Sequence, residues 1–184
     1  MTVPEITKRT VEFETPWFKV LSKNLKGMDP SGKEHQYYAV KPDDYVSILA
    51  VTTDNRVILI RQYRPAVEAY VLELPSGHVD KGEAPEASAK RELLEETGYY
   101  IEKAELLGCL MPDTGRMANR MWCYFSDNAI LSKSSPSGEE NIEVITCTID
   151  ELTKYICEDK FTHALNLGLV MLAVSKGKLT LAIN

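Results

Sequence analysis

Cysteine and histidine are scarce in this sequence, and neither forms a familiar metal-binding or disulfide pattern. The 184 residues contain four cysteines and three histidines, with no CxxC pair and no histidine at zinc-finger spacing. This favours buried, reduced thiols over a disulfide framework or a zinc site, and it predicts a reducing compartment, the cytoplasm. The cysteines are Cys109, Cys123, Cys147 and Cys157.

Long apolar segments are also missing. The longest apolar run, residues 165–174, is broken by Asn166 and Gly168 and is too short to span a bilayer. The N-terminal stretch MTVPEITKRTVEFE has no apolar targeting core. We therefore expect a soluble protein that has no membrane partner.

Basic residues are in the minority. Lysine and arginine number 21 against 27 aspartates and glutamates, which gives a net charge of −6. This balance argues against nucleic acid as a long-range partner, although local arginines and a metal can still hold a polyphosphate. A hydrophobic content of 44% is enough for one well-buried core.

The most informative stretch is GHVDKGEAPEASAKRELLEETGY, residues 77–99. Pro85 suits the first turn of a helix and Gly98 suits a left-handed C-terminal cap, so we predict a helix over residues 85–97. Three carboxylates share one face of this helix at i, i+3 and i+4: Glu92, Glu95 and Glu96. Such neighbours repel by roughly 0.2–0.5 kcal/mol per pair, which favours a hard cation between them, Mg²⁺ or Mn²⁺. The alternative is a solvated acidic helix face.

Spacing decides between these alternatives. The stretch fits G-x5-E-x7-R-E-U-x-E-E-x-G-U, where U is bulky and apolar or aromatic, from Gly77 to Tyr99. At ordinary residue frequencies this match has a chance probability on the order of 10⁻⁹ per start position. The pattern resembles the Nudix box at every defining position. The resemblance implies a Mg²⁺-dependent hydrolase of nucleoside diphosphates linked to another moiety, with Mn²⁺ as a possible substitute.

The resemblance also assigns roles to individual residues. The implied metal ligands are Glu92, Glu95, Glu96, a backbone carbonyl near Ser76, and Glu140 from a later loop. Glu140, with Glu139 as the next choice, is also the implied general base, while Glu95 shares the catalytic set with Arg91. Arg91 would steady Glu95 through its position four residues earlier.

Residues outside the Nudix box indicate which branch of the family the sequence resembles. The phrases RQYRP and ELPSG, within residues 61–77, resemble the ADP-ribose pyrophosphatase branch of the Nudix family. Arg64 and Glu73 are therefore expected at the substrate, although Arg64 pairing with a surface acid is the ordinary alternative. In that branch, N-terminal strands cross a homodimer and aromatic residues stack on the adenine. Trp17 and Tyr37 match those positions, the alternative being packing in the core or in the dimer seam.

The pattern of elements predicts an α/β/α sandwich on a mixed sheet, preceded by an N-terminal antiparallel hairpin over residues 17–40. We divide the chain into residues 1–41, for dimerisation and base binding, and residues 42–184, the hydrolase domain. The expected elements of the second part are strands at 46–51, 57–63, 104–111, 117–125 and 142–149, a loop at 126–138, and helices at 85–97, 149–157 and 162–174.

Together these features predict hydrolysis of a nucleoside diphosphate sugar, with ADP-ribose cleaved to AMP and ribose 5-phosphate. A GDP-hexose or a broad range of ADP-sugars is the alternative within this class. A catalytically silent nucleotide sensor and a purely structural acidic helix are alternatives from other classes. The complete carboxylate set together with Arg91 argues against a silent protein.

Overall fold

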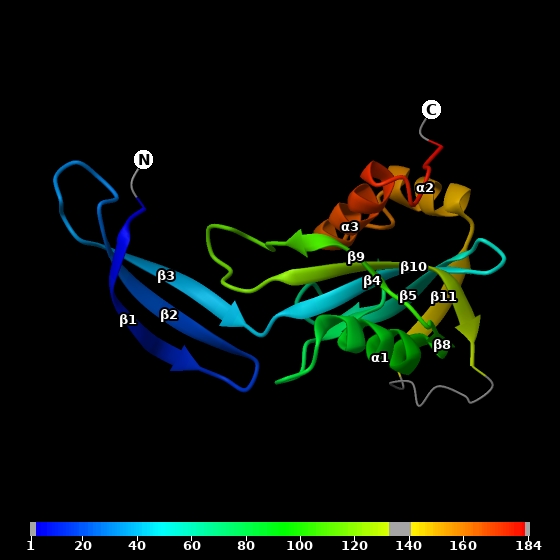
Figure 1. Cartoon of the computed structure of the whole chain (residues 1–184), viewed down its shortest axis with the longest axis horizontal. Helices are drawn as coiled ribbons and strands as arrows, with labels where there is room; N and C mark the ends of the chain where they lie inside the picture. The colour runs from blue at the N-terminus through cyan, green and yellow to red at the C-terminus, as the bar shows by residue number, and fades with distance from the viewer. Residues whose placement is uncertain (1–2, 133–140, 183–184) are drawn as a thin grey trace. The chain divides into compact units, whose positions relative to one another are not determined.

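A computed structural model describes residues 3–132 and 141–182 (Figure 1). The chain divides into two compact units. The smaller contains the described residues up to 44 together with residues 111–120, and the larger contains residues 45–110 and the remainder from 121 onward. No helix of the described ranges combines the length and the apolar character needed to cross a membrane.

The smaller unit is built on a three-stranded antiparallel sheet. Its strands, in spatial order, are β1 (Glu5–Glu14), β2 (Phe18–Lys26) and β3 (His35–Pro42). The β2–β3 pair is the predicted hairpin, but β1 was not predicted. Nearly every residue of β1 is exposed, so the strand lacks the alternating burial pattern that sequence analysis depends on. Residues 111–120 join this sheet through backbone hydrogen bonds, among them Ala118 N–H to the Val40 carbonyl at 2.9 Å.

A mixed sheet forms the centre of the larger unit. Its main strands, in spatial order, are β11 (Ile142–Cys147), β5 (Val57–Arg64), β4 (Tyr45–Thr52), β10 (Met121–Leu131) and β8 (Tyr99–Tyr100). Three shorter pairings complete it: β6 (Ala69–Glu73) on β5, β7 (Ser76–His78) on β4 and β9 (Glu105–Leu110) on β10. The β4–β10 pair is parallel and the other pairs are antiparallel.

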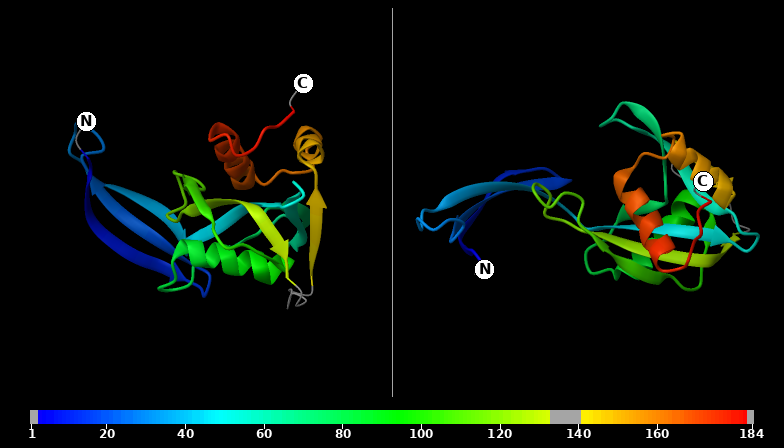
Figure 2. Two further views of the ribbon diagram at one scale, coloured as in Figure 1. Left: turned by 45° about the vertical axis from the view of Figure 1, so that its right-hand side comes forward. Right: turned by 90° about the horizontal axis from the view of Figure 1, so that it is seen from above.

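Helices cover both faces of this sheet. Helix α1 (Pro85–Thr97) lies on one face, while α2 (Ile149–Cys157) and α3 (Ala164–Ser175) lie on the other (Figures 1 and 2). The side chains of β4 point alternately to the two faces of the sheet, so this strand contributes to the core on both sides. Leu49 packs in the cluster that contains α3 residues, whereas Ile48 packs in the cluster that contains Leu93 of α1. The predicted α/β/α sandwich is confirmed.

Two sequence-based boundaries were wrong. The strand expected at 117–125 begins at Met121 and continues to Leu131, so residues 126–131 are strand and not loop. Ala129 pairs with Thr52, and Leu131 pairs with Tyr99. These partners are distant in the sequence, so the local polarity of the segment gave no sign of them.

The cysteines also depart from expectation. Cys123 and Cys147 are buried, and burial raises the pKa of their thiols to about 12 and about 11. Cys109 and Cys157 are exposed, so the expectation of buried thiols was wrong for these two.

Candidate active site

Helix α1 has the predicted bounds, and its ends are fixed as the sequence indicates. Pro85 is at the first helical position. Gly98 has a φ of 74° and donates its amide N–H to the Leu94 carbonyl at 2.9 Å. The buried side of the helix includes Ala89 and Leu93. This packing fixes the direction in which the carboxylate face of α1 points.

Arg91 joins the carboxylates of α1 to the preceding loop. Its Nη1 donates to Glu92 Oε1 at 2.7 Å and to Glu95 Oε2 at 3.0 Å. Its Nη2 donates to Glu83 Oε2 and to the His78 carbonyl, both at 3.1 Å. The hydrogen bond to Glu83 is the main cause of the raised pKa of Arg91. The guanidinium therefore stays protonated and balances several acids at once.

Glu83 is a residue whose structural role sequence reasoning missed. In the sequence it is visible only as the first glutamate of the motif G-x5-E-x7-R-E. Hydrogen bonds from Arg91 and from Ser88 Oγ, the latter at 2.6 Å, lower the pKa of its carboxyl. The ionised Glu83 thus holds Arg91 on the side opposite to Glu92 and Glu95.

Glu92 lies against the backbone of Gly77. A Cβ atom built on Gly77 would stand only 1.9 Å from Glu92 Cδ, so only glycine leaves room for this carboxylate. The Glu92 side chain is 15% exposed. Desolvation raises the pKa of its carboxyl, and the neighbouring Arg91 opposes the shift.

Glu96 contacts the same loop one residue earlier. The amide N–H of Ser76 donates to Glu96 Oε2 at 3.0 Å. Ser76 belongs to β7, which pairs with β4 so that Ser76 faces Ser47 and Gly77 faces Val46. The pairing of β7 with β4 therefore places Ser76 and Gly77 next to the carboxylate face of α1.

The residues at this face fit a hard divalent cation in the chemistry of their donors. Glu92, Glu95 and Glu96 supply carboxylate oxygens, the ligand type that Mg²⁺ and Mn²⁺ prefer. A bound cation would offset both the desolvation of the Glu92 carboxylate and its repulsion by Glu95. Within the described residues, no three side chains of His, Cys, Asp or Glu are grouped closely enough to hold an ion. Two of the three carboxylates, those of Glu92 and Glu95, instead form ion pairs with the guanidinium of Arg91.

Arg64 and Glu73, the two residues predicted to contact substrate, are paired with each other. Arg64 Nη2 lies 2.5 Å from Glu73 Oε2, and Arg64 Nε lies 3.0 Å from Glu73 Oε1. The Glu73 side chain is 5% exposed and also accepts from Gln62 Nε2 at 3.2 Å. This is a bidentate, partly buried pair, and so it orients the guanidinium more firmly than a surface ion pair would.

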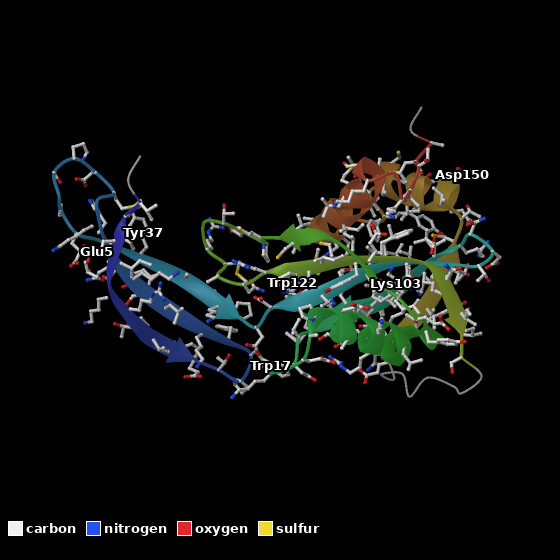
Figure 3. All side chains as sticks on the ribbon, in the orientation of Figure 1. Glu5, Trp17, Tyr37, Lys103, Trp122 and Asp150 are labelled. Carbon is white, nitrogen blue, oxygen red and sulfur yellow. The ribbon has the colours of Figure 1, made fainter. Side chains whose placement is uncertain are left out.

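Trp17 and Tyr37 are both exposed in the smaller unit but lie apart. Trp17, just before β2, is 72% exposed, and Tyr37 on β3 is 43% exposed. Tyr37 pairs with Lys23, so strand geometry places the two aromatics roughly 20 Å apart, toward opposite ends of the sheet (Figure 3). Tyr37 also lines a cavity of about 270 Å³ with Lys23 and Arg116. Within one chain the two rings cannot stack on the same base.

The predicted general bases, Glu139 and Glu140, lie outside the described residues, and their assignment remains a prediction. His163 is the N-cap of α3, and its Nδ1 accepts from the backbone N–H of Asn166 at 3.3 Å.

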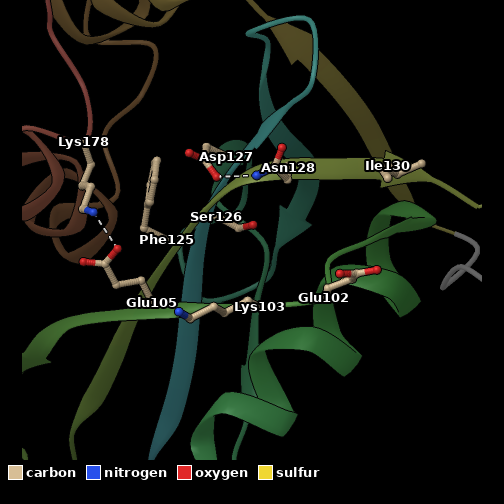
Figure 4. A pocket seen from close by; sticks show the side chains of 9 residues that line it. All are labelled: Glu102, Lys103, Glu105, Phe125, Ser126, Asp127, Asn128, Ile130 and Lys178. Carbon is tan, nitrogen blue, oxygen red and sulfur yellow. Dashed lines mark hydrogen bonds and ion pairs between the residues drawn. The ribbon is translucent and has the colours of Figure 1, made fainter.

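A second cavity, of about 520 Å³, is lined by none of the predicted site residues. It lies beside β10 in the larger unit (Figure 4). Four of its polar side chains form two pairs: Lys178 Nζ lies 2.6 Å from Glu105 Oε2, and Asn128 Nδ2 donates to Asp127 Oδ1 at 2.9 Å. The acidic face of α1 therefore remains the candidate active site.

Comparisons with known proteins show which family the chain resembles. The model of the NUDIX domain family matches residues 41–165. The chain is 31% identical to a methanol dehydrogenase activator of Bacillus methanolicus, over 71% of this chain and 72% of that protein. It is 30% identical to an ADP-ribose pyrophosphatase of Bacillus subtilis, over 69% and 70%, and 37% identical to an ADP-sugar pyrophosphatase of Mus musculus, over 60% and 55%.

The fold also has a solved counterpart. The crystal structure of an ADP compounds hydrolase superposes with a TM-score of 0.81, covering 97% of this chain and 98% of that chain. The sequence identity is 22%, so this likeness concerns the fold.

Proposed function

Because the chain belongs to the Nudix hydrolase family, we propose that it hydrolyses the diphosphate of a nucleoside diphosphate sugar, with ADP-ribose yielding AMP and ribose 5-phosphate. The observation that carries the proposal is the acidic face of α1, where Gly77 leaves room for the carboxylate of Glu92. The names of two relatives, an ADP-ribose pyrophosphatase and an ADP-sugar pyrophosphatase, support this choice of substrate class.

The proposed reaction requires Mg²⁺, for which Mn²⁺ can substitute. Glu92 and Glu96 would hold the ion together with Glu95, and a backbone carbonyl near Ser76 and Glu140 would complete the ligands. When bound, a divalent ion neutralises charge on the diphosphate and lowers the pKa of an attacking water. Arg91 would direct two of these carboxylates, since it contacts both Glu92 and Glu95.

Two further groups have proposed roles around the diphosphate. Arg64, oriented by its pair with Glu73, would bind the diphosphate, a geometry that suits a guanidinium better than an ammonium. Glu140, or else Glu139, would accept the proton of the attacking water.

The smaller unit would serve assembly and base recognition. We propose a homodimer in which residues 1–41 contact a second copy and Trp17 stacks on the base, with Tyr37 as a further contact. The exposed aromatic and aliphatic side chains of this unit, which include Phe13, Trp17 and Tyr38, support such an interface. The proposed location is the reducing cytoplasm.

A panel of nucleoside diphosphate sugars, assayed with Mg²⁺ and with products resolved by chromatography, tests the proposal. We expect ADP-ribose to give AMP and ribose 5-phosphate faster than GDP-hexoses or other ADP-sugars are cleaved, and EDTA to abolish the reaction. Tight binding of a nucleotide without turnover in Mg²⁺ or Mn²⁺ would indicate a sensor instead.

A further inference from the structure

Asn166 is a polar residue buried in the apolar helix α3. It is 1% exposed, and both the oxygen and the nitrogen of its side-chain amide have hydrogen-bond partners. Its Oδ1 accepts from the Leu74 amide at 2.9 Å, and its Nδ2 donates to Ser47 Oγ at 3.1 Å. A buried amide whose oxygen and nitrogen are both hydrogen-bonded holds its partners in one arrangement.

The hydroxyl groups of Ser47 and Ser76 extend this set of hydrogen bonds. Ser76 Oγ lies 2.8 Å from the Leu74 carbonyl and 2.9 Å from Ser47 Oγ. A carbonyl has no proton to give, so the single proton of the Ser76 hydroxyl goes to Leu74, and Ser47 donates to Ser76. Ser47 in turn accepts from Asn166. The hydrogen bonds therefore form a closed ring that begins and ends at Leu74.

This ring holds the backbone that meets the carboxylates of α1. Leu74 and Ser76 are in the ring, and Ser76 also donates its amide N–H to Glu96 at 3.0 Å. The next residue, Gly77, is the one against which Glu92 packs. Asn166 belongs to α3, which covers the face of the sheet opposite to α1 (Figure 2). The segment 74–77 is therefore hydrogen-bonded to α3 on one side and contacts α1 on the other.

We propose that Asn166, acting through Ser47, is a positioning residue that sets the Leu74–Gly77 backbone at the distance from α1 that the metal-binding carboxylates require. The inference rests on the proposed metal-dependent function, because it concerns the same carboxylates. Asn166 suits this role because it offers an acceptor and a donor on one rigid plane. Alanine has neither, and an ionised aspartate keeps the acceptor for Leu74 but loses the donor to Ser47.

The test uses the full chain carrying Asn166→Ala, Asn166→Asp or Ser47→Ala, with Thr153→Val as the control. Thr153 is also buried, and its hydroxyl donates to the Ile149 carbonyl within α2, away from the loop. Three quantities are measured: amide hydrogen exchange of Ser76 by NMR without metal, binding of Mn²⁺ alone by calorimetry, and kcat and KM with the substrate found in the panel.

We expect Asn166→Ala and Ser47→Ala to speed exchange of the Ser76 amide by at least about fivefold relative to other strand amides. Mn²⁺ affinity and kcat should each fall roughly ten- to a hundredfold, with a much smaller change in KM. Thr153→Val should lower thermal stability without any of these changes. If the Asn166 variants fail to fold, Ser47→Ala alone decides the matter.

Ser76 exchange and Mn²⁺ affinity in folded Ser47→Ala that match the wild type within twofold would overturn the proposal. Losses of kcat in all variants, the control included, that follow only the loss of folded protein would also overturn it. If the wild-type protein cleaves no nucleoside diphosphate sugar, the proposed function fails. The exchange and Mn²⁺ measurements then still decide whether Asn166 positions the loop.

Discussion

The carboxylate of Glu92 fills the space that a side chain on Gly77 would occupy, since a Cβ there would lie 1.9 Å from Glu92 Cδ. The glycine of the loop and the first acid of the carboxylate face are thus one structural unit, although the helix begins between them. This contact makes the loop and α1 depend on each other, and it leads to the first prediction.

Gly77→Ala should displace Glu92 and lower kcat by about a hundredfold, because a shift of roughly 1 Å in a positioned group has an effect of that order. The fold should survive with little change in the free energy of unfolding, because the added methyl meets only the far end of the Glu92 side chain. Steady-state kinetics and thermal melting on the same protein measure both effects. Gly108→Ala is the control, because its added methyl meets only the flexible end of Leu172, at 3.3 Å. Equal activity in both variants would contradict the contact's importance.

Glu96→Gln should keep the fold and lower activity with Mg²⁺ by tenfold or more, on the order seen when a metal site is disturbed. The substitution removes one charge and one hard ligand while the side-chain volume barely changes. Glu86→Gln is a matched control on the same helix, where Glu86 pairs with Lys90 away from the carboxylate face. It should remain within about twofold of the wild type. Turnover of Glu96→Gln at the wild-type rate, or full wild-type activity in EDTA, would refute the metal mechanism.

Glu140→Gln should lower kcat by roughly a hundredfold with little change in Mn²⁺ affinity, provided that Glu140 acts as the general base. If it is mainly a metal ligand, affinity for Mn²⁺ should fall together with kcat. Glu139→Gln is the neighbouring comparison. A larger loss in Glu139→Gln than in Glu140→Gln would exchange their assignments, and full activity in both would remove this loop from the chemistry.

The sequence predicted the bounds of α1 because the signals for them are local. Pro85, Gly98 and the i, i+3, i+4 carboxylates all lie within a few turns of one helix, and the structure has that helix with the same bounds. The Nudix family was identified from the same stretch. Local patterns also sufficed for α2, whose capping box at Thr148 and Glu151 is present.

Two of the features that sequence analysis missed depend on partners far along the chain. Strand β10 continues past Phe125 because β4 and β8 pair with it. Strand β1 was missed for a different reason: its partner β2 is close in the sequence, but β1 is exposed along nearly its whole length and has no alternating burial pattern. Ser47 and Asn166 are 119 residues apart, so nothing in either segment shows that they meet. A faint signal did exist, since each is a polar residue that interrupts an apolar run. Such an interruption indicates a buried hydrogen bond without naming its partner.

The smaller unit provides a prediction about assembly. Strand β1 is the outer strand of its sheet, and many apolar side chains of the unit are exposed, so we expect the full chain to be a dimer in sedimentation at micromolar concentration. Removing residues up to Val40 should give a monomer or an aggregate, because residues 111–120 also lose the strand to which they bond. A strictly monomeric full chain with full activity would contradict the proposed dimer.

Trp17→Ala should weaken substrate binding without disturbing the metal, if Trp17 of a neighbouring subunit stacks on the base. Stacking contributes about 1–3 kcal/mol, which corresponds to a rise in KM of roughly five- to more than a hundredfold. The value of kcat should fall much less, because the contact lies far from the reacting phosphorus and forms equally in the ground state and the transition state. Steady-state kinetics, Mn²⁺ calorimetry and thermal melting on the same variant measure these effects.

Tyr70→Ala is the control for Trp17→Ala, because Tyr70 is an aromatic residue of similar exposure, 69% against 72%, in the larger unit. It should leave KM within about twofold of the wild type. If Trp17 is only a packing residue of the dimer seam, its loss should instead lower the melting temperature or dissociate the dimer, and activity would fall in proportion to the assembled protein. An unchanged KM in a well-folded dimer would remove Trp17 from the substrate site and leave Tyr37, at the other end of the sheet, as the aromatic residue to test next.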